Sequence, residues 1–326
     1  MTEEAAVVAD PPPFADVADA APAQPPKPSE TIDAWDVEQR QWAVLLRQDA
    51  PDAAWLAQFE ATAERLRRLA QRDPDAALYL LLQSAAGDLD RYSAHHAMLC
   101  AVVCDLCAQN QAWSADEADA LWRAALSMNL ALTVTQDSLA RQIGPLSAAQ
   151  RELVDAHAES SARMLSDAGA TDALWLDVVR RHHERGAGAA ASPAERLAAL
   201  LHRVDVYTAK LSRRATREPT SPAIAARDAC LDADGRPDAI GATLLRTIGL
   251  YPPGCFVELA SGEVGVVIRR GAKAHTPVAA ALRRHDGGLY LQPLRRDTAL
   301  ARYAIKRGVN AKAVRVHMNH PRTLAA

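Results

Sequence analysis

Histidines are the residues of this 326-residue chain whose type and spacing could do chemistry. The stretch VVRRHHERGAG places His182 and His183 side by side, followed by Glu184 and then two glycines. Neighbouring residues of a helix point about 100° apart, so the two rings do not share a helix face. One interpretation is an exposed helix end, where cationic imidazole suits the negative end of the helix dipole. The other is that both rings converge on a metal ion, which neutral imidazole binds well.

The rest of the histidine set lies in segments with a helical pattern. His95, His96, His157 and His202 belong to it, and Asp205 follows the last of them by three residues. Imidazole nitrogens together with a carboxylate suit Zn, Fe or Mn. No pair forms a short motif such as HExxH, so the spacing alone does not identify a site. We expect His95 at the surface beside His96, and His202 at the surface or next to the ligands.

Cysteines share the first histidine segment. Cys100, Cys104 and Cys107 follow His96 at helical spacing, and the last two form a C-x-x-C pair. Such a pair could serve redox or zinc chemistry. Apolar residues interleave the three, and a free cysteine packs as a small hydrophobic residue. The pattern therefore favours core packing for all three.

The elements that must position these residues are mainly helices. Helical patterns run from about Ile32 to Leu211, and capping boxes begin at Ser114, Ser147 and Ser192. After Pro252-Pro253-Gly254, short apolar runs flank turns at Ser261-Gly262 and at residues 285–288, which is typical of hairpins. The sequence predicts a mostly α fold with a small β module of about four strands. The expected divisions are a disordered tail (1–31), a helical domain (32–248), the β module (249–298) and a basic C-terminal tail (299–326).

Composition narrows the class of protein. The net charge is −3, but residues 1–36 hold eight acids against one base, Lys27. No apolar run is long enough to span a membrane, and the N-terminus lacks the pattern of a signal peptide. Five cysteines without a disulfide framework suit a reducing compartment, so we expect a cytoplasmic protein. The basic C-terminus is interpreted as a solvated tail, which disfavours nucleic acid as the partner.

Five segments in succession resemble the HD-GYP family of bacterial phosphodiesterases that open cyclic di-GMP. They are YSAHHAMLCAV (92–102), AALSMNLAL (124–132), LSAAQRELVDAH (146–157), RHHERGAG (181–188) and RVDVYTAKLSRRATRE (203–218). The family has a histidine helix, an LLHDIGK helix, an E…H helix, an HHE…GYP turn and a DvyDA…RpYR helix in this order. The stretch YPPGCFVELASGEVGVV also looks like a β extension found in some members. The resemblance implies an HD-domain-like helical bundle.

The resemblance also implies roles for particular residues. It matches His157, His182, His183, His96 and Asp205 to metal ligands. Arg214 and Arg217 match family arginines near the substrate phosphates, a role that suits the planar, two-pronged guanidinium.

Three features of the sequence depart from the family pattern. Met128-Asn129 stands where the family has the His-Asp pair whose Asp bridges two metals, and Thr208 replaces the second Asp of DvyDA. The turn after His183 has no Tyr-Pro. Methionine is a poor ligand for hard divalent ions and asparagine carries no charge. The family's chemistry activates a water between two cations, so these changes weigh against it.

Two functional hypotheses remain. In the first, the chain is a degenerate HD-GYP-like protein, weakly active or inactive, that binds a cyclic dinucleotide or a protein partner in cyclic di-GMP signalling. In the second, it is a metal-dependent phosphohydrolase with an altered site in which His157, His182 and His183 hold a single ion. Three protein ligands and a water form a workable catalytic arrangement. The expected cofactor is one Fe, Mn or Zn ion, or none.

Overall fold

The computed structural model describes residues 27–184, 191–229, 231, 238–314 and 316–326. The predicted disordered tail lies outside these residues up to position 26, and the first helix begins at Pro28. The helices before the sheet are α1 (Pro28–Leu45), α2 (Ala53–Arg72), α3 (Pro74–Gly87), α4 (Tyr92–Gln111), α5 (Ala115–Ser127), the 3-10 helix η1 (Leu130–Leu132), α6 (Thr133–Arg141), α7 (Ala148–Asp167), α8 (Ala173–Arg181), α9 (Pro193–Leu211), α10 (Pro222–Ala229) and α11 (Ala239–Ile248).

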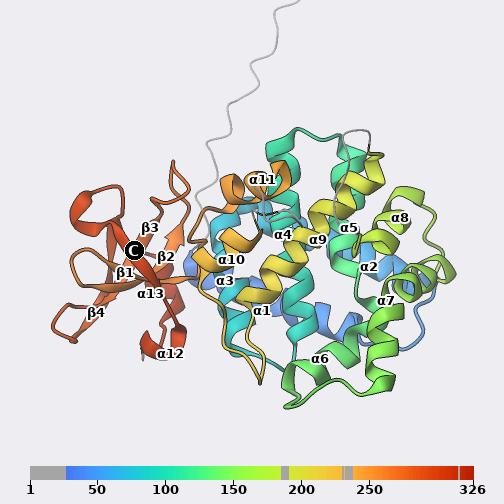
Figure 1. The fold of residues 1–326 in the computed structure, drawn as a ribbon, viewed down its shortest axis with the longest axis horizontal. Helices are drawn as coiled ribbons and strands as arrows, with labels where there is room; N and C mark the ends of the chain where they lie inside the picture. Colours follow the sequence, from blue (N-terminus) through green and yellow to red (C-terminus); the bar gives the residue numbers. More distant parts are fainter. Residues whose placement is uncertain (1–26, 185–190, 230, 232–237, 315) are drawn as a thin grey trace, which may run out of the picture.

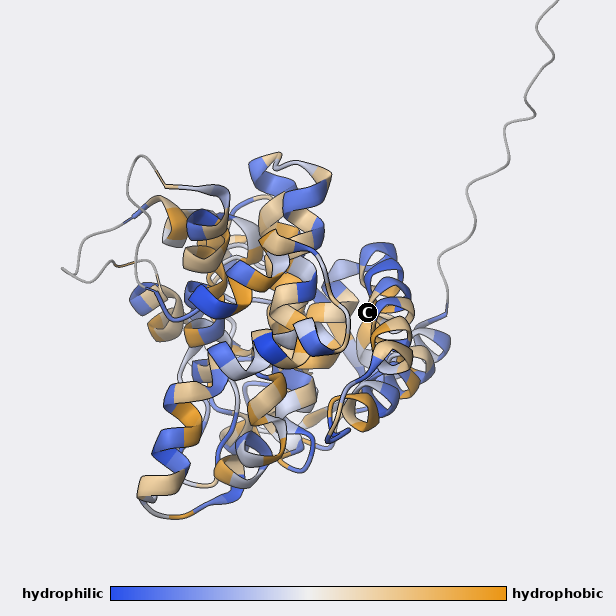
Figure 2. Ribbon diagram, turned by 90° about the vertical axis from the view of Figure 1, so that its right-hand side faces the viewer, coloured by the Kyte–Doolittle hydropathy of each residue, from blue (hydrophilic) through white to orange (hydrophobic). Residues whose placement is uncertain are grey.

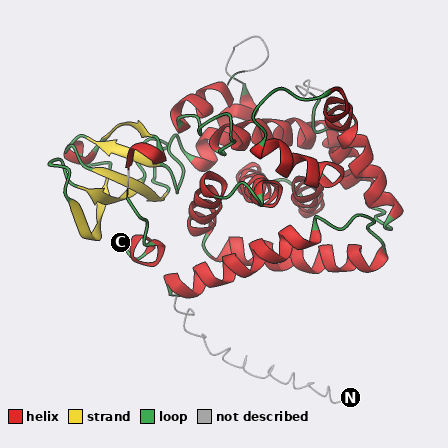
Figure 3. Ribbon diagram, turned by 90° about the horizontal axis from the view of Figure 1, so that it is seen from below, coloured by secondary structure: helices red, strands yellow, loops and turns green. Residues whose placement is uncertain are grey.

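The C-terminal part is an antiparallel sheet with three short helical pieces. Its elements are β1 (Phe256–Leu259), β2 (Val264–Arg269), β3 (Val278–Arg283), β4 (Leu289–Asp297), the 3-10 helix η2 (Ala301–Tyr303), β5 (Ile305–Val309), α12 (Ala311–Val314) and α13 (His320–Leu324). The fold class predicted from the sequence, a mostly α protein with a small C-terminal β module, is confirmed (Figure 3). The described helices include none that is both long and apolar enough to cross a membrane.

Helix α4 is the centre of the helical part. All of its residues from Tyr92 to Ala108 are buried, and it packs against α3, α5, α9 and α11 (Figure 1). A helix that is buried on every side needs small or apolar residues all round, which explains its three cysteines and its alanines. Other helices of the molecule carry both polar and apolar residues along their length, as the blue and orange segments of Figure 2 show. The predicted capping boxes at Ser114, Ser147 and Ser192 are confirmed, and they begin α5, α7 and α9.

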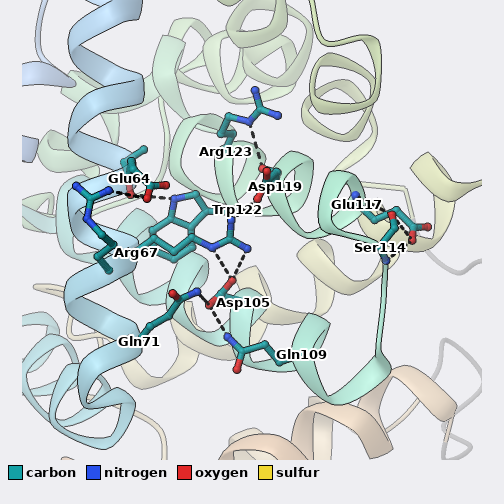
Figure 4. A network of polar contacts seen from close by, with 12 residues as sticks. Glu64, Arg67, Gln71, Asp105, Gln109, Ser114, Glu117, Asp119, Trp122 and Arg123 are labelled. Carbon is teal, nitrogen blue, oxygen red and sulfur yellow. Dashed lines mark hydrogen bonds and ion pairs between the residues drawn. The ribbon is translucent and has the colours of Figure 1, made fainter. Parts of the chain in front are cut away.

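A polar network ties three helices together (Figure 4). The Arg67 guanidinium of α2 donates to the carboxylate of Asp105 on α4 and also contacts Asp119 on α5. Gln71 and Gln109 donate to the second oxygen of Asp105. The Asp105 side chain is only 4% exposed, and a buried charge is tolerated only when it is paired and hydrogen-bonded. The network therefore fixes the position of α4 between α2 and α5.

The sheet has the strand order β4-β3-β2-β1-β5, so it contains one strand more than the sequence suggests. The fifth strand comes from the segment expected to be a basic tail, and it pairs with β1. Because side chains alternate along a strand, the sheet has two buried sides. Phe256, Val266 and Ile268 join the helical core, whereas Val257 and Val267 form a second, smaller core.

The β module rests directly on α3. Gly254 has a φ of +97°, and a side chain there would come within 3.0 Å of Leu82 Cβ and of the Tyr79 carbonyl. The carbonyl of Gly254 accepts a 2.6 Å hydrogen bond from Gln83 of α3. Arg270, just after β2, forms an ion pair with Asp75 at the start of α3. The absence of a side chain at position 254 therefore allows the segment before β1 to pack closely against α3.

The core of the helical part contains an aromatic cluster that should dominate its stability. Phe59 is fully buried, with its ring 5.2 Å from Trp55 and 5.5 Å from Trp175, both in stacked arrangements. We expect Phe59→Ala to lower the free energy of unfolding by about 3–5 kcal/mol, because it leaves a cavity among large rings. Urea unfolding followed by tryptophan fluorescence measures this. Val44→Ala, at a 67% exposed position, should change stability little; equal losses for both variants would contradict the prediction.

One expectation about α4 is wrong. His95, expected at the surface, is 1% exposed, and neither ring nitrogen has a hydrogen-bond partner among the described residues. Because α4 is surrounded by helices, a position next to His96 cannot reach solvent. Burial lowers the pKa of His95 to about 4. The folded protein therefore keeps this ring neutral.

The buried His95 ring should make stability depend on pH. Its pKa in the folded chain is below the ordinary value of about 6.5, so the unfolded chain takes up the proton first. The contribution of the neutral His95 ring to the free energy of unfolding is complete above about pH 6.5. It is lost as the pH falls toward about 4. We expect His95→Leu to reduce the loss of stability over this interval, measured by urea unfolding at several pH values. His285→Leu, at an exposed turn, should keep the wild-type dependence. An unchanged dependence in His95→Leu would refute the assignment.

Candidate metal centre

Three histidines meet where α7 and α8 pack together. His157 lies on α7, His182 is the C-cap of α8, and His183 follows in the turn. Asp172 is the N-cap of α8 and its side chain accepts from the Trp175 amide, and the helix buries Trp175, Val178 and Val179. Because its apolar side is fixed against the core, its C-terminal end is held beside α7. The two adjacent histidines lie at this end, where the chain leaves the helix and both rings can turn the same way.

The three rings present the same nitrogen to one another. The Nε2 atom of His157 is 3.2 Å from Nε2 of His182 and 3.1 Å from Nε2 of His183. Nδ1 of His182 lies 2.7 Å from the Val179 carbonyl, and Nδ1 of His157 contacts the Val154 carbonyl. A carbonyl oxygen only accepts, so in these two rings Nδ1 carries the proton and the neutral ring offers a lone pair at Nε2.

Two lone pairs that face each other repel unless a cation lies between them. Nitrogens that are about 2.0–2.1 Å from a tetrahedral zinc are about 3.3–3.4 Å apart. The observed separations of 3.1 and 3.2 Å are close to this geometry. Nδ1–H donation to a backbone carbonyl is also how metal-binding histidines are usually oriented. The residues present therefore fit a single divalent transition-metal ion.

Burial keeps the three rings neutral. Desolvation and the neighbouring His183 lower the pKa of His182 to about 3. Burial also lowers the pKa of His157, and burial together with His157 lowers that of His183. His157 and His182 are buried, whereas His183 is exposed and gives the group one side open to solvent. An ion held here would keep a position for water or an external ligand.

A second group of donors surrounds Asp205. The group consists of His96 and Cys100 on α4 and Asp205 on α9, and its donor atoms all lie within 4.8 Å of one another. Nε2 of His96 is 2.7 Å from the Asp205 carboxylate. Burial would raise the pKa of Asp205, but the hydrogen bond and charge of His96 lower it to about 2. Asp205 is thus an anion, and it is near enough to the three-histidine group to interact electrostatically with its rings.

The two predicted phosphate-binding arginines lie in different surroundings. Arg214 donates a 3.0 Å hydrogen bond to the Tyr92 hydroxyl, and its guanidinium lies over the Tyr92 ring at 5.3 Å. Tyr92 in turn stacks on His96, with ring centroids 5.7 Å apart. Arg217 is exposed and donates to the Ala209 carbonyl at the end of α9. Among the described residues, Arg214 is thus linked to the second donor group through Tyr92, whereas the Arg217 side chain contacts the backbone of α9.

The altered positions contribute no carboxylate. Met128 is fully buried in the hydrophobic core, and the Asn129 carbonyl accepts from the Leu132 amide in η1. The Thr208 hydroxyl donates to the Val204 carbonyl and lies 3.1 Å from Cys100 Sγ. Gly186-Ala187-Gly188, where the sequence has no Tyr-Pro, lies outside the described residues.

Sequence reasoning missed Cys100 as a neighbour of the donor groups, and it left two possible positions for His202. Cys100, predicted to be a core residue, is buried as expected but also contacts His96, with Sγ 3.7 Å from Nε2. The signal was the four-residue spacing of His96 and Cys100, which places them one above the other on a helix. Nδ1 of His202 is 3.1 Å from the His182 carbonyl, and its ring is 6.2 Å from that of His183. His202 therefore lies next to the ligands, one of its two expected positions.

Comparison with known proteins gives one partial similarity. No family model matches the chain, and no solved structure matches it. The chain is 32% identical over 145 residues to a protein of Pseudomonas aeruginosa named cyclic di-GMP phosphodiesterase PA4108. The match covers 42% of this chain and 35% of that protein, so the chain spans about a third of the length of the relative. This similarity agrees with the predicted relation to cyclic di-GMP phosphodiesterases, and it does not distinguish an active chain from a degenerate one.

Proposed function

We propose that the chain binds cyclic di-GMP at a metal ion held by His157, His182 and His183, and that it hydrolyses this dinucleotide far more slowly than an intact HD-GYP enzyme. The observation that carries the proposal is the convergence of three neutral imidazole nitrogens at 3.1–3.2 Å on one solvent-open side. The named activity of the 32% identical relative supports the choice of nucleotide. When bound, a divalent transition metal supplies a positive centre that attracts and polarises a phosphate oxygen.

The surroundings of the three histidines suit an anionic phosphate. The three rings are neutral, so an ion bound to them keeps its full charge toward solvent. Arg214 is held by Tyr92 close to the second donor group, where a guanidinium can contact phosphate oxygens. The same arginine cannot lose its charge, so its attraction for a phosphate is independent of pH.

The slow turnover follows from the residues at positions 128 and 129. A bridging carboxylate would lower the charge between two cations and help to hold a water for attack. Met128 is instead a core side chain, and Asn129 has no charge. Asp205 is the one carboxylate in the two donor groups found among the described residues. Binding is therefore retained more readily than hydrolysis.

A second candidate function is a one-metal phosphodiesterase. The exposure of His183 favours it, because an ion with three histidine ligands and one open position can hold a reactive water. The two candidates share the metal and the substrate, and they differ only in the rate of cleavage.

The metal site can be tested by elemental analysis of protein loaded with Zn²⁺ and dialysed. We expect one equivalent of bound Zn²⁺ to be lost in His157→Ala and in His182→Ala, because each change removes one of three ligands. Cys104→Ala is the matched control, since this cysteine is buried on α4 outside both donor groups. A zinc content equal to that of the wild-type chain in both histidine variants would contradict the assignment.

The nucleotide proposal can be tested with the full chain, loaded with Zn²⁺ or Mn²⁺. Calorimetry should show cyclic di-GMP binding that weakens at least about tenfold in His183→Ala and in metal-free protein, since a lost ion contact of about 1.4 kcal/mol corresponds to a factor of ten. Arg214→Ala should also weaken binding, whereas Arg141→Ala, at a surface ion pair with Asp90, should not.

The rate of cleavage separates the two candidates. Chromatography of the reaction products should show little linear dinucleotide from the wild-type chain. Rapid cleavage that disappears in His183→Ala would establish the one-metal phosphodiesterase in its place. Absence of any cyclic di-GMP binding to metal-loaded protein would reject both.

A further inference from the structure

The group around Asp205 contains a donor that the three-histidine group lacks. His96 and Cys100 lie one turn apart on α4, are 1% and 0% exposed, and face Asp205 of α9. The Cys100 sulfur is 3.7 Å from Nε2 of His96, and the same nitrogen is 2.7 Å from the Asp205 carboxylate. One nitrogen, one sulfur and one oxygen therefore surround a common point.

These separations suit a metal ion with a sulfur ligand. Zinc bonds of about 2.3 Å to sulfur and about 2.0–2.1 Å to nitrogen place the two ligand atoms about 3.5 Å apart in a tetrahedron. The observed 3.7 Å is within reach of this value by a small side-chain rotation. The 2.7 Å contact of His96 with Asp205 is a hydrogen-bond distance, and it would lengthen when an ion takes the place of the proton.

Cys104 and Cys107, the other cysteines of α4, have the surroundings expected of a cysteine that serves only as a core residue. Burial raises the pKa of Cys104 well above its usual range and that of Cys107 to about 12, so both stay protonated. Neither belongs to a group of donors found among the described residues. Cys100 differs because its sulfur lies 3.7 Å from the Nε2 atom of the His96 ring. The sulfur is also 3.1 Å from the Thr208 hydroxyl oxygen, whose proton is donated to the Val204 carbonyl.

We propose that His96, Cys100 and Asp205 form a second, thiolate-containing metal site that selects Zn²⁺, Co²⁺ or Cd²⁺ over Mg²⁺ and Mn²⁺. Thiolate is a soft ligand, whereas Mg²⁺ and Mn²⁺ prefer oxygen. On binding, one proton leaves the hydrogen bond between His96 and Asp205, another leaves the thiol, and both pass to solvent. The inference rests on the proposed function in that it names a second cation of the same centre.

The test is a titration of metal-free, full-length protein with Co²⁺. We expect two equivalents to bind, one of them with the near-ultraviolet absorption of a thiolate-to-cobalt charge transfer. Cys100→Ser should lose this absorption and one equivalent, whereas Cys104→Ser should keep both. Excess Mg²⁺ should not compete for the equivalent that gives the absorption. Circular dichroism checks that each variant is folded.

A histidine variant separates this inference from the proposed function. In His157→Ala we expect the charge-transfer absorption to remain while the other equivalent is lost. A wild-type chain that binds one Co²⁺ without this absorption would leave the three-histidine site standing and overturn the thiolate site. An absorption that persists in Cys100→Ser would also overturn it.

A further measurement does not depend on the folding of variants. Cadmium NMR of the Cd²⁺-loaded wild-type chain should give one resonance shifted strongly downfield by a sulfur ligand. A spectrum with resonances typical of nitrogen and oxygen ligands alone would reject the proposal.

Discussion

The repulsion between facing imidazole lone pairs is the constraint on which the candidate centre depends. In His157 and His182, the backbone carbonyls of Val154 and Val179 hold the proton on Nδ1, so both rings turn an unprotonated Nε2 inward. At a separation of 3.2 Å this arrangement calls for a cation between the two nitrogens. A proton could play that part, but burial opposes any positive charge on these rings, and the pKa of His182 is lowered to about 3. A coordinated metal ion satisfies both nitrogens without placing the charge on a ring.

The rest of the helical part positions this arrangement. Helix α8 reaches α7 because its apolar side is fixed by Trp175, which stacks on Phe59 of α2. Helix α9 packs against α8 and brings His202 to the His182 carbonyl, just before Asp205 in the chain. Helix α4 supplies the second donor group, and the ion pair of Arg67 with Asp105 fixes α4 near its other end. The aromatic cluster and the polar network do not include the histidines, but they fix the helices that carry them.

Much of the fold could be predicted from the sequence, and the reasons are local. Capping boxes and proline breaks act within a few residues, so the starts of α5, α7 and α9 and the end of the helical part were visible. The strand β5 could not be predicted from the sequence, because its pairing with β1 joins residues about fifty positions apart. Its own residues are also mostly charged or small. His95 was misplaced for a similar reason: burial of α4 on all sides is a property of four neighbouring helices. The grouping of His157 with His182 and His183 followed from a family resemblance, whereas Cys100 was assigned to the core because a buried cysteine has the same sequence pattern in either role.

The charge balance of the two donor groups connects the altered positions with the proposed preference for binding over cleavage. The three histidines are neutral, and the second group offers a carboxylate from Asp205 and the sulfur of Cys100, which would be a thiolate when bound to a metal ion. Met128 and Asn129 add no negative charge. Divalent ions held by these residues would therefore keep a net positive charge, which attracts a phosphodiester from solvent. The same excess of charge also stabilises a bound phosphate in its ground state. Because only interactions that strengthen in the transition state speed a reaction, a centre of this kind favours a bound nucleotide over a cleaved one.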